Sequence, residues 1–199
     1  MATSRRQSWE ATVRIMSASV ANPGDPEIRL PDPSLVVLIG AAGAGKSTFA
    51  GRWFMADEIL CSDQLRADIS GDAADQSATA AAFALLHDRL GDRLRAGRLT
   101  VVDATNVRRS ARRSLLVRAT EANLPAVAIV LDLPRETVHA RNEARRERVV
   151  ESAVIDRQLA DLGRTLARDQ LAAEGFLAVT RITSTAELQG LIVRRVPAT

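Results

Sequence analysis

Gly40 to Ser47 is the stretch of the chain whose residue types and spacing are best suited to chemistry. It reads Gly-Ala-Ala-Gly-Ala-Gly-Lys-Ser and fits the phosphate-binding pattern G-x-x-x-x-G-K-[ST]. In that pattern the backbone N–H groups cradle phosphates, the lysine reaches the β- and γ-phosphates, and the serine hydroxyl faces Mg²⁺. Lys46 is the only lysine among 27 basic residues, so it stands at the position where a compact ammonium suits best. We expect ATP and Mg²⁺ to bind through Gly40, Gly43, Ala44, Gly45, Lys46, Ser47 and Thr48.

Three aspartates follow apolar runs, where parallel strands end and ligands bind. Asp63 precedes Arg66 by three residues, so it could accept a proton from an attacking hydroxyl while the arginine holds a phosphate. An N-cap role for Asp63 is equally consistent with the sequence. Asp103 ends Val-Val-Asp, a form that holds Mg²⁺, and Asn106 lies in the same loop. Asp132 precedes Leu-Pro and reads as a helix cap.

Three arginines in the C-terminal half have helical spacing. Arg141, Arg145 and Arg148 stand at i, i+4 and i+7, which places them on one face if a single helix carries them. Such a face could close over a triphosphate and neutralise charge that develops during phosphoryl transfer. In an arginine-rich chain the same spacing also describes an ordinary solvated face.

Short apolar runs alternate with helical sequence, which predicts an α/β domain with a parallel sheet of about five strands. The clearest run, Leu35 to Ile39, is unbroken and ends at glycine, as expected for a strand buried on both faces. The other predicted strands are 59–61, 99–102, 126–131 and 177–182.

Apolar stripes at helical spacing predict the helices that cover this sheet. They lie at 83–94, 115–122 and 155–166, and residues 46–52 predict a helix directly after the phosphate loop. Residues 1–25 are polar and lack a sustained period, so we expect a flexible tail followed by one domain over 26–199.

Composition limits the classes of function. The chain has 199 residues, 46% hydrophobic and 26% charged, and lacks an apolar run near the roughly 20 residues of a membrane span. We therefore expect a soluble protein with no membrane partner. A single cysteine, Cys61, excludes an internal disulfide and fits the reducing cytoplasm. The formal charge of +3 permits a phosphate-rich partner without requiring one.

Together these motifs resemble the kinase module of bacterial polynucleotide kinase-phosphatases, the end-healing enzymes of RNA repair. The resemblance runs from about Glu27 to the C-terminus and rests on more than the glycine loop. Its other parts are Ser62-Asp63 with Arg66, Asp75-Gln76, Ala82-Phe83 with His87, Leu99 to Asn106, and Arg141-Asn142 with Arg145 and Arg148.

This resemblance implies a P-loop kinase fold, with helices on both faces of the sheet and an arginine-bearing helical lid. It implies transfer of the γ-phosphate of ATP to 5′-OH ends of single-stranded RNA or DNA, with Asp63 as general base. Arg66 would grip the phosphate next to the 5′ nucleoside, Arg141 and Arg145 would serve the lid, and Asn106 and Arg148 would contact the substrate. The family enzymes continue into phosphatase and ligase modules, so this sequence would be either a free-standing kinase that relies on separate partners for those steps or an excised domain.

Two other functions remain open at this stage. A P-loop kinase of a small metabolite would share the scaffold, and a nucleotide-dependent switch would bind and slowly hydrolyse ATP without transfer. Arg66 distinguishes the metabolite kinase from the polynucleotide kinase, because a substrate with no phosphate beside its hydroxyl gives this arginine little to hold. Aromatic residues are only 3%, so a base-stacking platform is not expected and sequence preference should be weak.

Overall fold

The computed structural model describes residues 27–73, 75, 77–145, 149–167 and 170–198. The predicted flexible tail at 1–25 and the predicted substrate residue Arg148 lie outside these ranges. Within them, no helix combines the length and apolar character needed to cross a lipid bilayer.

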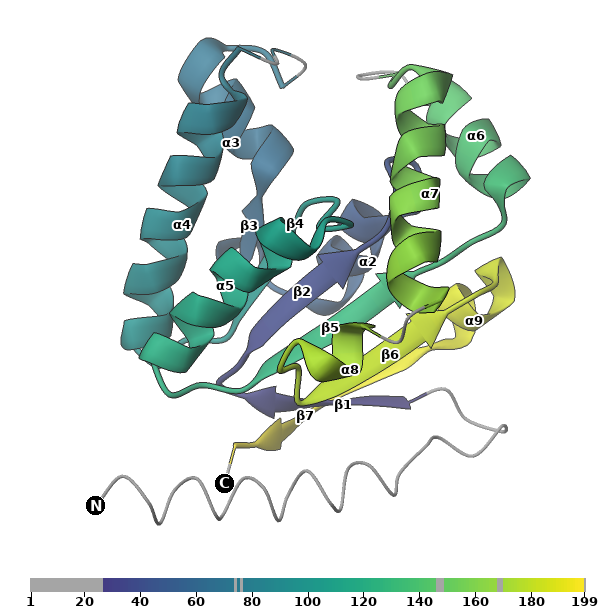
Figure 1. Cartoon of the computed structure of the whole chain (residues 1–199). Coiled ribbons are helices and arrows are strands. Elements are labelled where there is room, and N and C mark those ends of the chain that lie inside the picture. The colour runs from purple at the N-terminus through teal and green to yellow at the C-terminus, as the bar shows by residue number, and fades with distance from the viewer. Residues whose placement is uncertain (1–26, 74, 76, 146–148, 168–169, 199) are drawn as a thin grey trace.

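A five-stranded parallel sheet forms the centre of the molecule, in the order β3-β4-β2-β5-β6 (Figure 1). Its strands are β2 (Leu35–Ile39), β3 (Ile59–Cys61), β4 (Thr100–Asp103), β5 (Ala126–Leu131) and β6 (Ala178–Ile182). Every residue of β2 is fully buried, which requires cover on both faces and explains its unbroken apolar sequence. The five predicted strands and the α/β fold class are confirmed.

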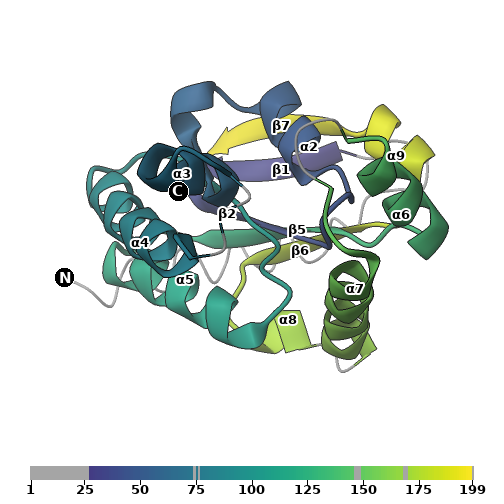
Figure 2. The same ribbon diagram turned by 90° about the horizontal axis from the view of Figure 1, so that it is seen from above.

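Side chains of β2 alternate between the two faces of the sheet, so both faces are apolar and both are covered by helices. Leu35, Val37 and Ile39 face one apolar cluster, whereas Val36 and Leu38 face the other. Figure 2, from above, shows α4, α5 and α8 on one side of the sheet and α2 on the other. The helices are α2 (Lys46–Trp53), α3 (Ser62–Ser70), α4 (Thr79–Arg95), α5 (Arg109–Glu121), α7 (Ser152–Ala167) and α8 (Gln170–Ala173).

The helix that follows β5 ends earlier than the arginine spacing requires. This helix, α6, spans Arg135–Glu143, and α7 begins only at Ser152. The Asn142 amide donates to the Val150 carbonyl (2.8 Å) and accepts from the Val150 N–H (3.0 Å). These bonds join the end of α6 to Val150, and Arg145 follows the helix instead of continuing it. Arg141 lies on α6 and Arg145 lies beyond its last residue, so the two arginines do not share one helix as their spacing would allow.

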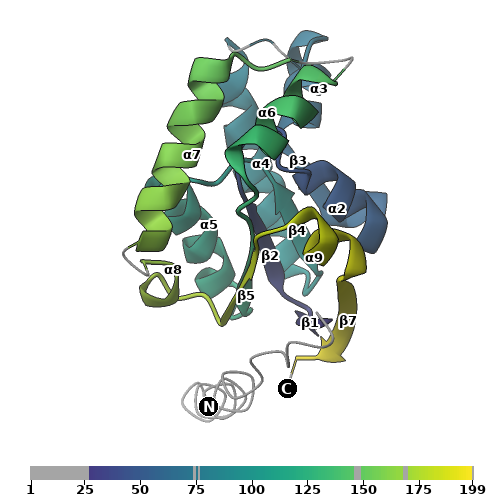
Figure 3. The same ribbon diagram turned by 90° about the vertical axis from the view of Figure 1, so that its right-hand side faces the viewer.

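Two terminal strands that the sequence patterns did not predict form a second, smaller parallel sheet (Figure 3). They are β1 (Glu27–Asp32) and β7 (Ile192–Pro197), which follows the short helix α9 (Thr185–Gly190). Arg195 of β7 binds Glu58 with 2.7 and 2.8 Å contacts and lies 3.5 Å from Asp32. The Glu58 pair links the C-terminal strand to the short η1 turn (Ala56–Glu58) that precedes β3.

Candidate active site

The phosphate loop connects the carboxyl end of β2 to α2. The chain turns to opposite sides of β2 to form β4 and β5, so this loop lies at the topological switch point of the sheet, where ligands bind. The first helical bond runs from the Phe49 N–H to the Gly45 carbonyl (2.9 Å). No side chain caps α2 and no acidic residue stands in its first turn. Within the described residues, the N–H groups of Lys46, Ser47 and Thr48 are therefore left for an anion.

Helix α6 packs directly on this loop. A Cβ added at Gly43 would lie 2.6 Å from the Val138 carbonyl oxygen, and Gly43 has φ of 85°, so this position needs glycine. The guanidinium of Arg141 donates to the Ala44 carbonyl (3.4 Å) and to the Thr185 hydroxyl (3.1 Å). Arg141 thus lies at the phosphate loop, as the sequence predicts.

Lys46 lies buried beside the loop, with 8% of its surface exposed. Its ammonium donates to the Ala41 carbonyl at 2.9 Å. Burial lowers the pKa of Lys46 below its ordinary value of 10.5, while the charges of Asp103 and Asp63 oppose that change and the charge of Arg145 adds to it. Both aspartates and Arg145 therefore lie within electrostatic range of the lysine.

Asp63 and Arg66 form an ion pair across the first turn of α3. The cap position of this helix is Cys61 and no side chain caps it, so the N-cap alternative for Asp63 is wrong. Arg66 is 6% exposed at its side chain, against 36% for Asp63. One Arg66 nitrogen donates to the Ala73 carbonyl (2.7 Å), whereas its buried Nε has no hydrogen-bond partner among the described residues. Asp63 therefore lies nearer to solvent, with a buried cation behind it.

The donors suited to Mg²⁺ are few. Asp103 is a carboxylate only 4% exposed at the end of β4, and the side chain of Ser47 is exposed at the start of α2. The described residues contain no group of three or more His, Cys, Asp or Glu able to hold a metal. One carboxylate and one hydroxyl fit a Mg²⁺ ion that takes its remaining oxygens from phosphates and water.

Asn106 has a different use from the substrate contact predicted for it. It is 3% exposed, and its amide donates to the Leu38 carbonyl (2.8 Å) and the Ala104 carbonyl (3.3 Å). Its positive φ of 48° is a conformation that asparagine tolerates well. These contacts tie the loop after β4 to β2, so the geometry favours a positioning role.

A buried ion pair that no sequence pattern indicated supports that loop. Arg112 of α5 is fully buried and binds both carboxylate oxygens of Glu174 at 2.7 Å. Its third nitrogen donates to the carbonyls of Asn106 (3.0 Å) and Val107 (2.8 Å). The partners lie 62 positions apart in the chain, and one arginine among many carries no signal of burial.

Gln158 of α7 is a second residue that the sequence reasoning missed. Its side-chain oxygen accepts a 2.8 Å hydrogen bond from the N–H of Ala42, within the phosphate loop. Together with the bond from Arg141 to Ala44, this contact holds α6 and α7 against the phosphate loop.

Asp132 does not cap the following helix, which corrects the sequence-based expectation. The cap position of α6 is Pro134, and the Asp132 carboxylate instead pairs with Arg181 of β6. This pair joins two strand ends and involves none of the predicted site residues.

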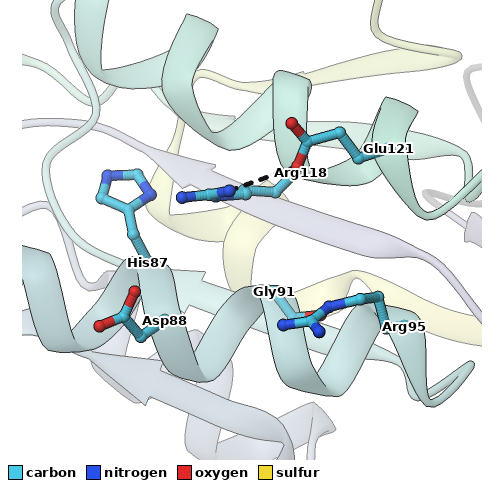
Figure 4. A pocket seen from close by; sticks show the side chains of 6 residues that line it. All are labelled: His87, Asp88, Gly91, Arg95, Arg118 and Glu121. Carbon is cyan, nitrogen blue, oxygen red and sulfur yellow. Dashed lines mark hydrogen bonds and ion pairs between the residues drawn. The ribbon is translucent and has the colours of Figure 1, made fainter.

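A hollow between α4 and α5 lies away from this site (Figure 4). Its volume of about 220 Å³ is below the 300–1,000 Å³ typical of ligand pockets. Burial and the facing charge of Arg118 lower the pKa of His87. The lining residues belong to the later turns of both helices, toward the opposite edge of the sheet from the phosphate loop. They are His87, Asp88, Gly91, Arg95, Arg118 and Glu121.

Several solved structures have a fold similar to that of this chain. A chain of the Pnkp1/Rnl/Hen1 RNA repair complex matches 70% of this chain with a TM-score of 0.60 and 22% identity. A chain of the AvrRxo1-ORF1:-ORF2 complex, solved with ATP, matches 77% with a TM-score of 0.56 and 18% identity. A putative kinase from Chloroflexus aurantiacus matches 77% with a TM-score of 0.50 and 15% identity.

The first two matches also cover only part of the matched chains. The chain spans 47% of the RNA repair chain and 55% of the AvrRxo1 complex chain, against 86% of the putative kinase. At these identities the likeness shows the fold alone. No curated protein matches the sequence.

A family model assigns the chain independently of these structures. The model of an AAA domain family, AAA_33, matches residues 35–167, which begin at β2 and end with α7. This range holds the phosphate loop, Asp63, Asp103 and Arg141, the residues that the structure gathers at the carboxyl edge of the sheet. The chain therefore belongs to the AAA_33 family of AAA domains and has a P-loop kinase fold.

Proposed function

We propose that this protein is an ATP-dependent polynucleotide 5′-hydroxyl kinase, which transfers the γ-phosphate of ATP to 5′-OH ends of RNA or DNA. The observation that carries the proposal is the Asp63–Arg66 pair beside the buried ammonium of Lys46. A carboxylate near solvent supplies a base for a hydroxyl, and a buried arginine next to it supplies a partner for an adjacent phosphate.

The residues divide the work of an in-line displacement. The 5′ oxygen bonds to the γ-phosphorus as the bond to the β–γ bridging oxygen breaks, and the hydroxyl proton passes to the Asp63 carboxylate. Arg66 holds the phosphate that follows the 5′ nucleoside. Lys46, Arg141 and Arg145 neutralise charge on the transferred group. Ser47 and Asp103 would hold Mg²⁺, which would supply further neutralisation of the phosphate oxygens when bound.

The phosphate beside the acceptor hydroxyl distinguishes this function from that of a small-metabolite kinase. Arg66 is buried and already bound to Asp63, so a neutral substrate would leave the pair as it is. A substrate with a phosphate there gives the arginine a second anion.

Label transfer from γ-labelled ATP tests the proposal. With Mg²⁺ present, we expect label on a 5′-OH oligonucleotide and none on the same strand bearing a 5′-phosphate. Gluconate and free nucleosides serve as metabolite acceptors. Efficient transfer to one of these, with none to the oligonucleotide, would show a metabolite kinase, and ATP hydrolysis without transfer to any acceptor would show a switch.

Arg66→Ala sharpens that assay. We expect it to abolish most transfer to the oligonucleotide while ATP still binds, with Arg29→Ala on the exposed surface of β1 as the matched control. Unchanged transfer by Arg66→Ala would remove the role assigned to this arginine.

A further inference from the structure

Arginines gather around the first turns of α5, outside the phosphate-transfer site. α5 has no acidic side chain in its first turn. Arg108 and Arg109 have side chains 79% and 69% exposed, and Arg113, one helical turn beyond Arg109, is also exposed. We name Arg108, Arg109 and Arg113 the α5 arginine surface.

The carboxylates near this surface already have closer partners. Arg108 lies 3.6 Å from Asp161, which pairs more closely with Arg164 of α7. Arg109 lies 3.8 Å from Glu174, which binds Arg112 at 2.7 Å.

Four guanidinium groups therefore share two carboxylates, and no described carboxylate lies within ion-pair distance of Arg113. This local excess of positive charge is as large as the formal charge of +3 on the whole chain. The exposed guanidinium groups of Arg108 and Arg109 are held only weakly at these distances, so they are readily available to phosphate.

The surface lies at the same edge of the sheet as the transfer site. α5 follows β4, whose strand is parallel to β2, so the helix begins at the carboxyl edge (Figures 1 and 2). Arg108 is five residues beyond Asp103, a span of at most ~17 Å between Cα atoms. The bonds from Arg112 to the Asn106 and Val107 carbonyls fix the start of α5 against this loop. A strand whose 5′ end lies at Asp63 has this surface within a few nucleotides.

We propose that the α5 arginine surface binds the phosphodiester backbone downstream of the 5′-OH end, so that this surface selects a polynucleotide over a short acceptor. This rests on the proposed function, because it assigns the continuation of the same substrate. Arginine side chains on a strand backbone bind without reading sequence, which agrees with a chain that is only 3% aromatic.

The test compares wild type with the triple variant R108Q/R109Q/R113Q. Its control, R29Q/R98Q/R194Q, removes the same charge from exposed arginines elsewhere. Fluorescence anisotropy measures binding of a labelled single-stranded 5′-OH 12-mer as salt is raised. Label transfer then gives KM for the 12-mer and for a 5′-OH dinucleotide.

We expect the triple variant to bind the 12-mer roughly tenfold more weakly and to lose about 2 from its salt slope, since each phosphate contact on a single strand contributes about 0.7. KM should rise for the 12-mer and stay within about twofold for the dinucleotide. Equal binding by triple variant and control, or an equal rise of both KM values, would overturn the assignment. If the surface binds the 12-mer as expected but wild type transfers no label, the proposed function fails and the binding surface stands.

Discussion

The buried pair between Arg112 and Glu174 yields a quantitative prediction. Arg112 is fully buried, and Glu174 is 4% exposed at its side chain. Arg112→Met removes two contacts of 2.7 Å to the carboxylate and two hydrogen bonds to the Asn106 and Val107 carbonyls. Breaking a buried pair on one side costs about 3–5 kcal/mol, because the remaining charge stays buried without its partner.

Arg109 reduces that loss only in part, because it lies 3.8 Å from Glu174. We therefore expect Arg112→Met to lower the free energy of unfolding by about 3–4 kcal/mol, a large share of a typical total of about 5–15 kcal/mol. The double variant R112M/E174M should recover much of this loss, since no buried charge is left unpaired.

Urea unfolding followed by far-UV circular dichroism measures these values, with Arg113→Met on the exposed side of α5 as the matched control. The control should change the free energy of unfolding by less than about 0.5 kcal/mol. A loss below about 1 kcal/mol for Arg112→Met, or a double variant less stable than the single one, would refute the reasoning about the buried pair.

Three further predictions concern the phosphate loop. Gly43→Ala, whose Cβ would meet the Val138 carbonyl at 2.6 Å, should weaken ATP binding at least ~10-fold by calorimetry, whereas Gly163→Ala, with open space around it, should not. Burial lowers the pKa of Lys46 below 10.5 in the folded protein. Between this lowered pKa and 10.5 the unfolded chain binds more protons than the folded one, so the stability of the nucleotide-free protein should rise as pH approaches 10.5. Lys46→Met should flatten this rise in urea titrations, and an unchanged dependence of stability on pH would contradict the prediction. Gln158→Ala leaves the Ala42 N–H without its 2.8 Å acceptor and should slow phosphate transfer more than it weakens ATP binding. The isosteric Gln158→Glu should partly restore the transfer rate. An equal loss of transfer rate and ATP affinity in Gln158→Ala would show a binding role instead.

Strands and helices with a regular burial pattern were predictable from the sequence. β2 and β5 are buried at every position, so their apolar runs are continuous and easily recognised. The stripe on α4 holds because Leu86, Leu90 and Leu94 all face the core. β1 and β7 were missed because β7 is mostly exposed and carries two arginines, which breaks the apolar pattern of a strand.

The composition of the site was predictable, but the direction of each side chain was not. The loop pattern and the strand-end acids named Lys46, Asp63 and Asp103, and the charges of both aspartates act on Lys46 in the structure. Spacing alone could not show that α6 stops at Glu143, because that end depends on the contact between Asn142 and Val150. The inward turn of Asn106 likewise depends on Leu38, 68 positions away.

The central claim is that Asp63 accepts the proton of a 5′-hydroxyl during transfer from ATP. The most direct test is a single-turnover measurement of label transfer to a 5′-OH oligonucleotide by wild type and Asp63→Asn, with ATP affinity measured on the same samples. Asp68→Asn is the control, an exposed carboxylate on the same helix whose partner is Gln64.

We predict that Asp63→Asn slows transfer by about 10²–10⁴-fold while its ATP affinity stays within about threefold of wild type, and that Asp68→Asn transfers normally. Transfer by Asp63→Asn at the wild-type rate would contradict the role of Asp63 as the base. Failure of wild type to label the 5′-OH strand while binding ATP would contradict the proposed function itself.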